Sequence, residues 1–237
     1  MAAINDNLQA VGARIRHAAH TAGRDPAKIR LLAVTKTFPA AAIEAAFAAG
    51  QCSFGENYVQ EACDKMMLLK SKEPAARMEW HLIGPLQSNK TRVVAECFDW
   101  VQTIEREKTA RRLSEARSAD AAPLNVLIQV NVSGERSKSG VHPAGLAALA
   151  REIAALPRLR LRGLMAIPEP TADQSLQRSR FREVRELFDR LCGAGLALDT
   201  LSMGMSQDLE AAIAEGATMV RVGTAIFGER TGVRAAA

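Results

Sequence analysis

Lys36 is the residue of this sequence with the clearest capacity for covalent chemistry. It ends the segment IRLLAVTK (29–36), which is mostly apolar before it. Desolvation at the end of a buried strand favours the neutral amine of a lysine, and a neutral amine attacks an aldehyde or ketone to form a Schiff base. From its position alone, Lys36 is equally well explained as a solvated strand end or as an ion-pair partner of Glu56.

Two glycine-bearing turns provide the second chemical signal. The segments LSMGMSQD (201–208) and RVGTAIFG (221–228) each leave an expected strand through small residues. The N-terminus of a following helix offers free N–H groups to an anion, and phosphate sites after strands seven and eight recur in (β/α)8 barrels. Together the turns predict a phosphate site. The candidate residues are Ser202, Gly204, Ser206, Gly223 and Thr224.

A phosphate site opposite Lys36 leaves two classes of ligand open. One is a phosphorylated aldehyde or ketone sugar, as in Schiff-base aldolases, and the other is pyridoxal 5'-phosphate (PLP), which carries both groups on one ring. Arg221 favours PLP, because an arginine facing the pyridine nitrogen keeps that nitrogen unprotonated and weakens the ring as an electron sink. An aldolase would require acids or a second lysine for proton transfer. The alternative for Arg221 is an ion pair at the rim with Glu229.

The elements that must position these residues alternate between strand and helix. Apolar strands separated by helices indicate parallel βαβ units, and eight of them match a closed (β/α)8 TIM barrel better than a doubly wound sheet. We expect one domain over 1–237, with an extra N-terminal helix at about 2–22 and the barrel at about 29–230. The expected strands are 29–36, 52–55, 79–84, 98–104, 124–132, 159–167, 198–204 and 217–224, and the expected helices are 39–50, 56–70, 86–97, 105–119, 143–155, 173–193 and 206–215.

Composition narrows the classes of function. The net charge is +5, but basic residues alternate with acids in QRSRFREVRELFDR (177–190) and only 4% of residues are aromatic, which argues against nucleic-acid binding. The four cysteines form no CxxC pair, so we expect no zinc site or disulfide and a reducing cytoplasm. No apolar run approaches the length of a membrane span.

Seven segments together resemble the pyridoxal phosphate homeostasis protein family, the single-domain relatives of alanine racemase. They lie between residues 31 and 228 and include every expected strand except the fourth. The resemblance implies a PLP-binding barrel of fold type III. The segments are AVTKT, FGENYVQE, WHLIGPLQSNK, NVSGERSKSG, GLMAIP, LSMGMSQDLEAAI and ATMVRVGTAIFG.

The resemblance also implies a role for each candidate residue. Lys36 would carry the cofactor covalently, and Arg221 would face its pyridine nitrogen. Lys138, in SGERSKSG, is either a second lysine near the cofactor or an exposed loop lysine. The phosphate would be held by Ser202, Gly223 and Thr224, with Ser206 as a further candidate, and the ring or its approach would be lined by Asn57, His81 and Met165.

The family is thought to control the supply of PLP without an established catalytic activity. A racemase of this barrel type takes its second base, a tyrosine, from a separate β-domain, and we expect none here because the printed chain ends soon after the eighth strand. The expected function is therefore non-catalytic PLP binding by a cytoplasmic monomer, with apo-PLP enzymes as recipients. The alternative is an amino-acid racemase or another Schiff-base enzyme that uses Lys36 with Lys138, His81 or Tyr58.

Overall fold

Eight parallel strands form a closed barrel in which each strand pairs with the next along the chain and β1 pairs with β8. The structure is a computed structural model that describes residues 2–70, 78–134 and 139–229. The predicted (β/α)8 barrel is confirmed. Its strands are β1 (Arg30–Val34), β2 (Ser53–Glu56), β3 (Glu79–Leu82), β4 (Trp100–Ile104), β5 (Leu124–Gln129), β6 (Leu159–Met165), β7 (Thr200–Ser202) and β8 (Met219–Val222).

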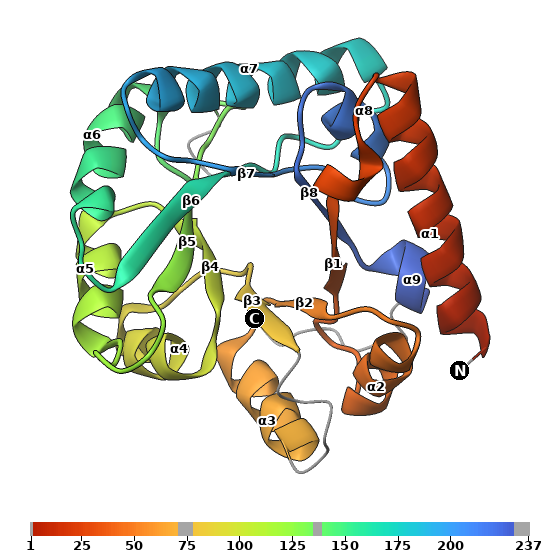
Figure 1. Cartoon of the computed structure of the whole chain (residues 1–237), viewed down its shortest axis with the longest axis horizontal. Helices are drawn as coiled ribbons and strands as arrows, with labels where there is room; N and C mark the ends of the chain where they lie inside the picture. The colour runs from red at the N-terminus through yellow and green to blue at the C-terminus, as the bar shows by residue number, and fades with distance from the viewer. Residues whose placement is uncertain (1, 71–77, 135–138, 230–237) are drawn as a thin grey trace.

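Helices surround the barrel as an outer ring (Figure 1). They begin where sequence signals place them: Pro143 opens α6 behind His142, and the carboxylate of Asp173 accepts hydrogen bonds from the first amides of α7. The helices are α1 (Ala2–Thr21), α2 (Ala40–Ala48), α3 (Val59–Lys70), α4 (Thr91–Cys97), α5 (Glu107–Ala116), α6 (Pro143–Ala154), α7 (Gln174–Gly193), α8 (Leu209–Ala214) and α9 (Thr224–Phe227), with short 3-10 turns η1 (Pro26–Lys28) and η3 (Ser88–Lys90).

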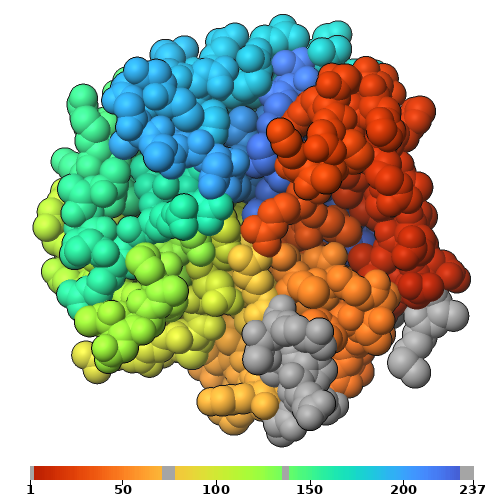
Figure 2. Space-filling model, in the orientation of Figure 1, coloured from red at the N-terminus to blue at the C-terminus, as the bar shows by residue number. Residues whose placement is uncertain are grey.

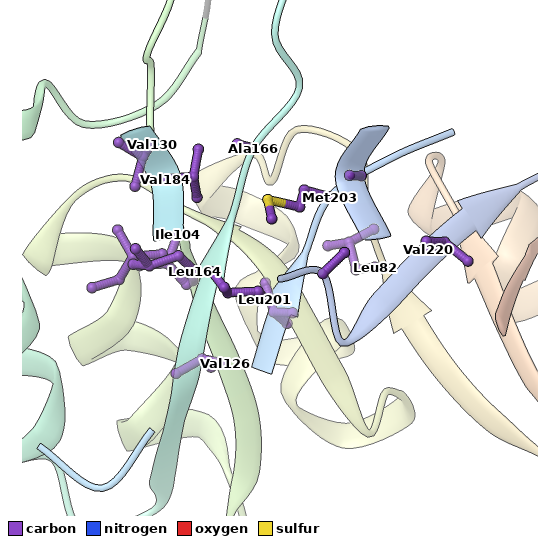
Figure 3. Close-up of a cluster of buried hydrophobic side chains, with 14 of the residues drawn as sticks. Leu82, Ile104, Val126, Val130, Leu164, Ala166, Val184, Leu201, Met203 and Val220 are labelled. Atoms are coloured by element: carbon purple, nitrogen blue, oxygen red, sulfur yellow. The ribbon is translucent and has the colours of Figure 1, made fainter. Parts of the chain in front are cut away.

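The main hydrophobic core lies between the strands and the ring of helices. Successive strand side chains point to opposite faces, and the outward set is apolar. Leu164 of β6 and Leu201 of β7 are register partners and lie side by side in this layer, with Val184 of α7 nearby (Figure 3). Burial of this layer from both sides explains why the strands read as continuous apolar runs.

Inside the barrel, polar and aromatic side chains lie beside a few apolar ones. Trp100, Leu127 and Met165 form a separate small cluster. Below it, at the N-terminal ends of the strands, Glu79 pairs with Arg30 and accepts hydrogen bonds from Ser53 Oγ (3.0 Å) and Trp100 Nε1 (2.5 Å). The N-terminal end of the barrel is therefore filled by charged groups that neutralise one another.

A second ion pair occupies the same end. Arg162 donates to Asp199 through both Nε (2.8 Å) and Nη2 (2.7 Å) and to Asn125 Oδ1 (3.0 Å), and its guanidinium lies 4.9 Å from the centre of the Trp100 ring. We call Arg30, Glu79, Asn125, Arg162 and Asp199 the basal cluster.

The extra N-terminal helix α1 packs against α8 and α9, so the red start of the chain lies against its blue end (Figure 2). Arg14 of α1 bonds to Glu210 of α8 (2.9 Å) and to the carbonyl of Ser206 (3.0 Å), and Asn7 Nδ2 donates to the carbonyl of Ile226 (2.8 Å). Helix α1 thus buttresses the two segments that follow β7 and β8.

The structure shortens several expected elements. The seventh strand has three residues, and the chain after β8 forms the short helix α9 within the segment that sequence had assigned to strand and turn. None of the described helices combines the length and apolar character needed to cross a membrane.

Candidate cofactor-binding site

A cavity of about 530 Å³ opens at the C-terminal ends of the strands. We call it the mouth cavity. Its size falls in the usual range for small-molecule sites, roughly 300–1,000 Å³. Its walls come from the ends of β1, β2, β3 and β8 and from the loops after β6 and β7. The lining residues are Val34, Lys36, Asn57, Ile83, Ile167, Pro168, Pro170, Thr171, Gln177, Met205, Ser206, Gln207, Asp208, Arg221, Gly223, Thr224 and Ala225.

Lys36 sits at the wall of this cavity on a strand end that a buried ion cluster holds in place. The ammonium of Lys65 in α3 donates to the carbonyl of Thr35 (2.8 Å), to Glu56 Oε1 (2.7 Å) and to Glu61 Oε1 (2.6 Å). Thr35 Oγ1 donates to the same oxygen of Glu56 (2.7 Å). Burial raises the pKa of Glu56, and the charge of Lys65 opposes that shift.

The backbone turns sharply just after Lys36. Thr37 adopts φ 67°, a left-handed conformation that is uncommon for a residue other than glycine. Its amide donates to Glu61 Oε1 (2.5 Å), and the amide of Phe38 returns to the carbonyl of Thr35 (3.0 Å). The backbone on both sides of Lys36 is therefore held by hydrogen bonds, and this restricts the position of the Lys36 Cα atom.

Arg221 is 4% exposed and enters the cavity from β8. Its Nη1 donates to the carbonyl (2.6 Å) and the hydroxyl (2.9 Å) of Ser202, and its Nη2 donates to the carbonyl of Ala166 (2.9 Å). Burial lowers the pKa of Arg221 to about 10, and the nearby charge of Asp208 opposes the shift. The guanidinium stays protonated at neutral pH, yet no carboxylate of the described residues forms an ion pair with it.

The cavity is also lined by hydroxyls and helix-start amides. Ser206 and Thr224 line the cavity, and Gly223 and Thr224 begin α9, whose first amides have no carbonyl partner within that helix. Gly223 also lies close to β1: a Cβ there would stand 3.1 Å from the carbonyl oxygen of Val34. A side chain at this position would crowd the end of β1, two residues before Lys36.

Asn57 contributes an unsatisfied polar atom to the cavity. Its Oδ1 is buried and has no hydrogen-bond partner among the described residues. The backbone of Asn57 is held by close packing against Gly84, where an added Cβ would lie 2.2 Å from the Asn57 carbonyl oxygen. Buried polar atoms are normally paired, so this oxygen marks a place where a ligand can donate a hydrogen bond.

Comparison with known proteins shows which family the chain resembles. Residues 7–231 match the family model of the alanine racemase N-terminal domain. The pyridoxal phosphate homeostasis protein of Pseudomonas aeruginosa is 59% identical over 97% of both chains, and its namesake from Escherichia coli is 54% identical over 96% of this chain and 97% of that one.

The chain belongs to the pyridoxal phosphate homeostasis protein family. Among solved structures, PipY of Synechococcus elongatus superposes on it with a TM-score of 0.84 at 36% identity, over 95% of this chain and all of the other. PipY has also been solved with PLP bound, with a TM-score of 0.83. Alanine racemase of Clostridium difficile, at 13% identity and a TM-score of 0.78, shares the barrel fold over 60% of its own length.

Six residues that sequence singled out come together at the cavity of this family member. They are Lys36, Asn57, Ser206, Arg221, Gly223 and Thr224. Lys138 lies outside the described residues. Met165, which was expected to line the ring or its approach, is fully buried in a cluster with Trp100 and Leu127 and is not among the residues that line the cavity.

His81 and Ser202 also lie below the cavity, inside the barrel. His81 is 0% exposed, stacks on Trp100 at 5.1 Å between ring centroids and faces Gln102. The hydroxyl of Ser202 donates to Gln102 (2.7 Å) and accepts from Arg221, so it is already fully engaged. Neither residue is among those that line the cavity, so the predicted roles of His81 at the ring and Ser202 at the phosphate stay predictions.

Sequence reasoning overlooked two features of the site. Asp208 lines the cavity, and its carboxylate accepts from the amide of Met205 (2.5 Å); burial raises its pKa. Gln102 lies in a fully buried strand. The sequence could have identified Gln102, since an uncharged polar residue within the apolar segment FDWVQTI (98–104) indicates a buried side chain that needs hydrogen-bond partners.

Proposed function

We propose that this chain binds pyridoxal 5'-phosphate at the mouth cavity and takes part in PLP homeostasis by storing, delivering or limiting the cofactor, without a catalytic cycle of its own. The observation that carries the proposal is the joint placement of Lys36 and a buried, ligand-facing Arg221 in one cavity. Relatives at 59% and 54% identity are named for PLP homeostasis, and PipY has been solved with PLP bound.

The residues present fit this cofactor. When bound, PLP supplies an aldehyde for a lysine amine and an electron-withdrawing pyridine ring. Lys36 would bind the aldehyde, and Arg221, fixed by three oxygen acceptors, would donate to the ring nitrogen. Ser206 and Thr224, with the amides that start α9, would bind the phosphate. Asn57 Oδ1 would gain the partner that it lacks.

A non-catalytic role is supported by the scarcity of proton-transfer groups around the cavity. Reversible proton abstraction on both faces of a substrate requires two bases. Of the described lining residues, Asp208 alone carries a carboxylate, and it is bonded to the backbone of Met205. Tyr58 is 51% exposed and does not line the cavity. An arginine at the ring nitrogen further disfavours carbanion chemistry.

Reduction of the loaded protein with borohydride tests the cofactor assignment. We expect a stable adduct whose mass locates it on the peptide that contains Lys36, and we expect Lys36→Ala to lose both the adduct and the yellow absorbance. The matched control is Lys28→Ala, an exposed lysine at the opposite end of the barrel, which should load as the wild type does. An adduct retained in Lys36→Ala would overturn the assignment.

Two assays address the role as a carrier. Purified loaded protein should activate an apo-PLP enzyme, and the rate should exceed that obtained with an equal concentration of free cofactor. Incubation with individual amino acids should produce no racemisation or cleavage. Sustained turnover of any amino acid that disappears in Lys36→Ala would replace the carrier function with an enzymatic one.

A further inference from the structure

A continuous run of polar side chains passes from the mouth cavity through the barrel interior to the basal cluster. Arg221 Nη1 lies 2.9 Å from Ser202 Oγ, Ser202 Oγ lies 2.7 Å from Gln102 Oε1, and Gln102 Nε2 lies 3.0 Å from His81 Nδ1. His81 Nε2 lies 3.3 Å from Glu79 Oε2 and makes no hydrogen bond among the described residues. We call these five residues the axial chain. They come from five different positions on β3, β4, β7 and β8.

Met219 determines the orientation of the Gln102 amide. The Sδ atom of Met219 lies 3.2 Å from the Gln102 atom that faces His81. A thioether sulfur accepts a hydrogen bond and cannot donate one, so the atom opposite it must be the amide nitrogen. The amide oxygen is thereby turned toward Ser202.

Once the Gln102 amide is oriented, the positions of the Ser202 hydroxyl hydrogen and of the His81 ring hydrogen are determined. Gln102 Oε1 can only accept, so the Ser202 hydroxyl donates to it and keeps its lone pairs for Arg221. At the other end, His81 Nδ1 must accept from Gln102, which places the imidazole hydrogen on Nε2, toward Glu79. Burial lowers the pKa of His81, and this favours the neutral ring that the arrangement requires.

We propose that Gln102 is a positioning residue for Arg221, which it acts on through Ser202, and that Met219 fixes the orientation of the Gln102 amide. The inference rests on the proposed function, because Arg221 is taken to face the pyridine nitrogen of PLP. Without Gln102 the Ser202 hydroxyl is free to rotate. When its hydrogen turns toward the Arg221 guanidinium, the oxygen no longer accepts a hydrogen bond from Arg221. Arg221 would keep its two carbonyl acceptors and lose the one that sets its rotation.

The test uses full-length protein with Gln102→Met and Gln102→Glu. Gln102→Met keeps the length of the side chain and removes the acceptor, and we expect the dissociation constant for PLP to rise about threefold to tenfold with a change in the absorbance of the bound cofactor. Gln102→Glu keeps an acceptor for Ser202 and should bind PLP more nearly as the wild type does. The matched control is Asn125→Leu, which removes a barrel amide of the basal cluster that has no link to Arg221.

A measurement that needs no cofactor tests the direction of the chain. Nitrogen NMR of His81 in cofactor-free wild type should show a neutral ring with hydrogen on Nε2. In Gln102→Glu a carboxylate oxygen faces Nδ1, so the hydrogen should move to Nδ1 or the ring should become charged. This readout remains usable if Gln102→Met does not fold.

The outcomes separate the two proposals. A wild-type protein that binds no PLP refutes the proposed function, and the inference falls with it. A wild type that binds PLP while Gln102→Met binds equally well, or while both Gln102 variants and Asn125→Leu lose the same affinity, refutes the positioning role alone. A wild-type His81 with hydrogen on Nδ1 refutes the direction of the chain.

Discussion

The two ends of this barrel each hold an arginine, Arg162 at the base and Arg221 at the mouth, and the two have different kinds of partner. At the N-terminal end, Arg162 is paired with the carboxylate of Asp199 through two hydrogen bonds. At the mouth, Arg221 is held by two carbonyls and one hydroxyl, and no carboxylate of the described residues forms an ion pair with it. One arginine is neutralised within the fold, whereas the other keeps its full charge available to a ligand.

The different partners of the two arginines indicate that the base of the barrel contributes to stability and the mouth contributes to ligand binding. A buried charge that lacks a countercharge lowers stability, and such a feature persists at sites where function requires it. The basal cluster closes the end of the barrel where no lining residue of the mouth cavity lies. We therefore expect substitutions at the base to change the free energy of unfolding and substitutions at the mouth to change ligand affinity, except where a mouth residue is also part of a paired cluster.

Lys65→Met tests that exception and should have the largest effect. Lys65 is buried between two carboxylates beside the strand end that carries Lys36. Its loss leaves those carboxylates without a countercharge and should cost about 3–5 kcal/mol in the free energy of unfolding, measured by urea denaturation. The control Lys70→Met, at an exposed position on the same helix, should change it little. Equal losses from the two variants would contradict the structural importance of the cluster.

The pair Arg221→Met and Arg162→Met tests the comparison directly. Arg221→Met should weaken PLP binding by roughly tenfold to a hundredfold, because a charge-assisted hydrogen bond to the ligand is lost. Arg162→Met should leave PLP affinity within about twofold and lower the free energy of unfolding by about 1–3 kcal/mol. Absorbance titration and urea denaturation give the two quantities. A base variant that weakens binding as much as the mouth variant would remove the distinction.

Glu79→Gln sharpens the comparison through pH. Burial alone would raise the pKa of Glu79, but its contacts with His81, Arg30 and Trp100 lower it well below its ordinary value. The carboxylate therefore stabilises the fold above its unfolded pKa of about 4.3, and that contribution is lost as the pH falls toward the folded value. Wild type should exceed Glu79→Gln by about 2 kcal/mol from pH 8 to about pH 5.

Below about pH 4 this gap should narrow. Denaturation curves of both proteins across the range provide the measurement. A gap that stays constant into acid would show that the shape of the glutamate side chain, and not its charge, holds the basal cluster together.

Arg14→Ala should have the smallest effect. The pair between Arg14 and Glu210 is exposed, so its loss should cost about 0.5 kcal/mol. Because Arg14 also donates to the carbonyl of Ser206, PLP affinity should fall by less than about threefold. Arg16→Ala, on the same helix without a bond to the β7–α8 loop among the described contacts, is the control. A larger loss of affinity in Arg14→Ala would make α1 part of the binding site.

The sequence predicted the barrel because its strands are apolar on both faces and alternate with helices, a pattern that local periodicity contains. It also predicted Lys36 and Arg221 at the mouth, since both lie near the C-terminal ends of expected strands. It did not predict that His81, Met165 and Ser202 lie below the residues that line the cavity, and their contact with the cofactor stays a prediction. Whether a residue at a strand end faces the cavity or the barrel core depends on the stagger of neighbouring strands, and periodicity within one strand carries no record of that stagger.

The axial chain illustrates the same limit for interactions. Gln102 stood out as a polar residue in an apolar strand, but its partners lie on β3, β7 and β8, up to 117 positions away in sequence. A sequence can indicate that such an amide must find partners. Only the closed barrel brings Ser202 and Met219 to it and thereby sets its orientation.

The pairing of β1 with β8 has a consequence for the order of synthesis. Arg30 and Met219 are register partners. The free edge of β1, the first barrel strand to be synthesised, is therefore covered only after β8, the last one, has been added. Lys36 is synthesised before Arg221, Gly223 and Thr224, which follow only after six further strands. Long-range pairing of this kind is slow to form and leaves edges exposed in the meantime. We expect a nascent chain to carry Lys36 through the synthesis of the six strands from β2 to β7 before it gains the rest of the pocket.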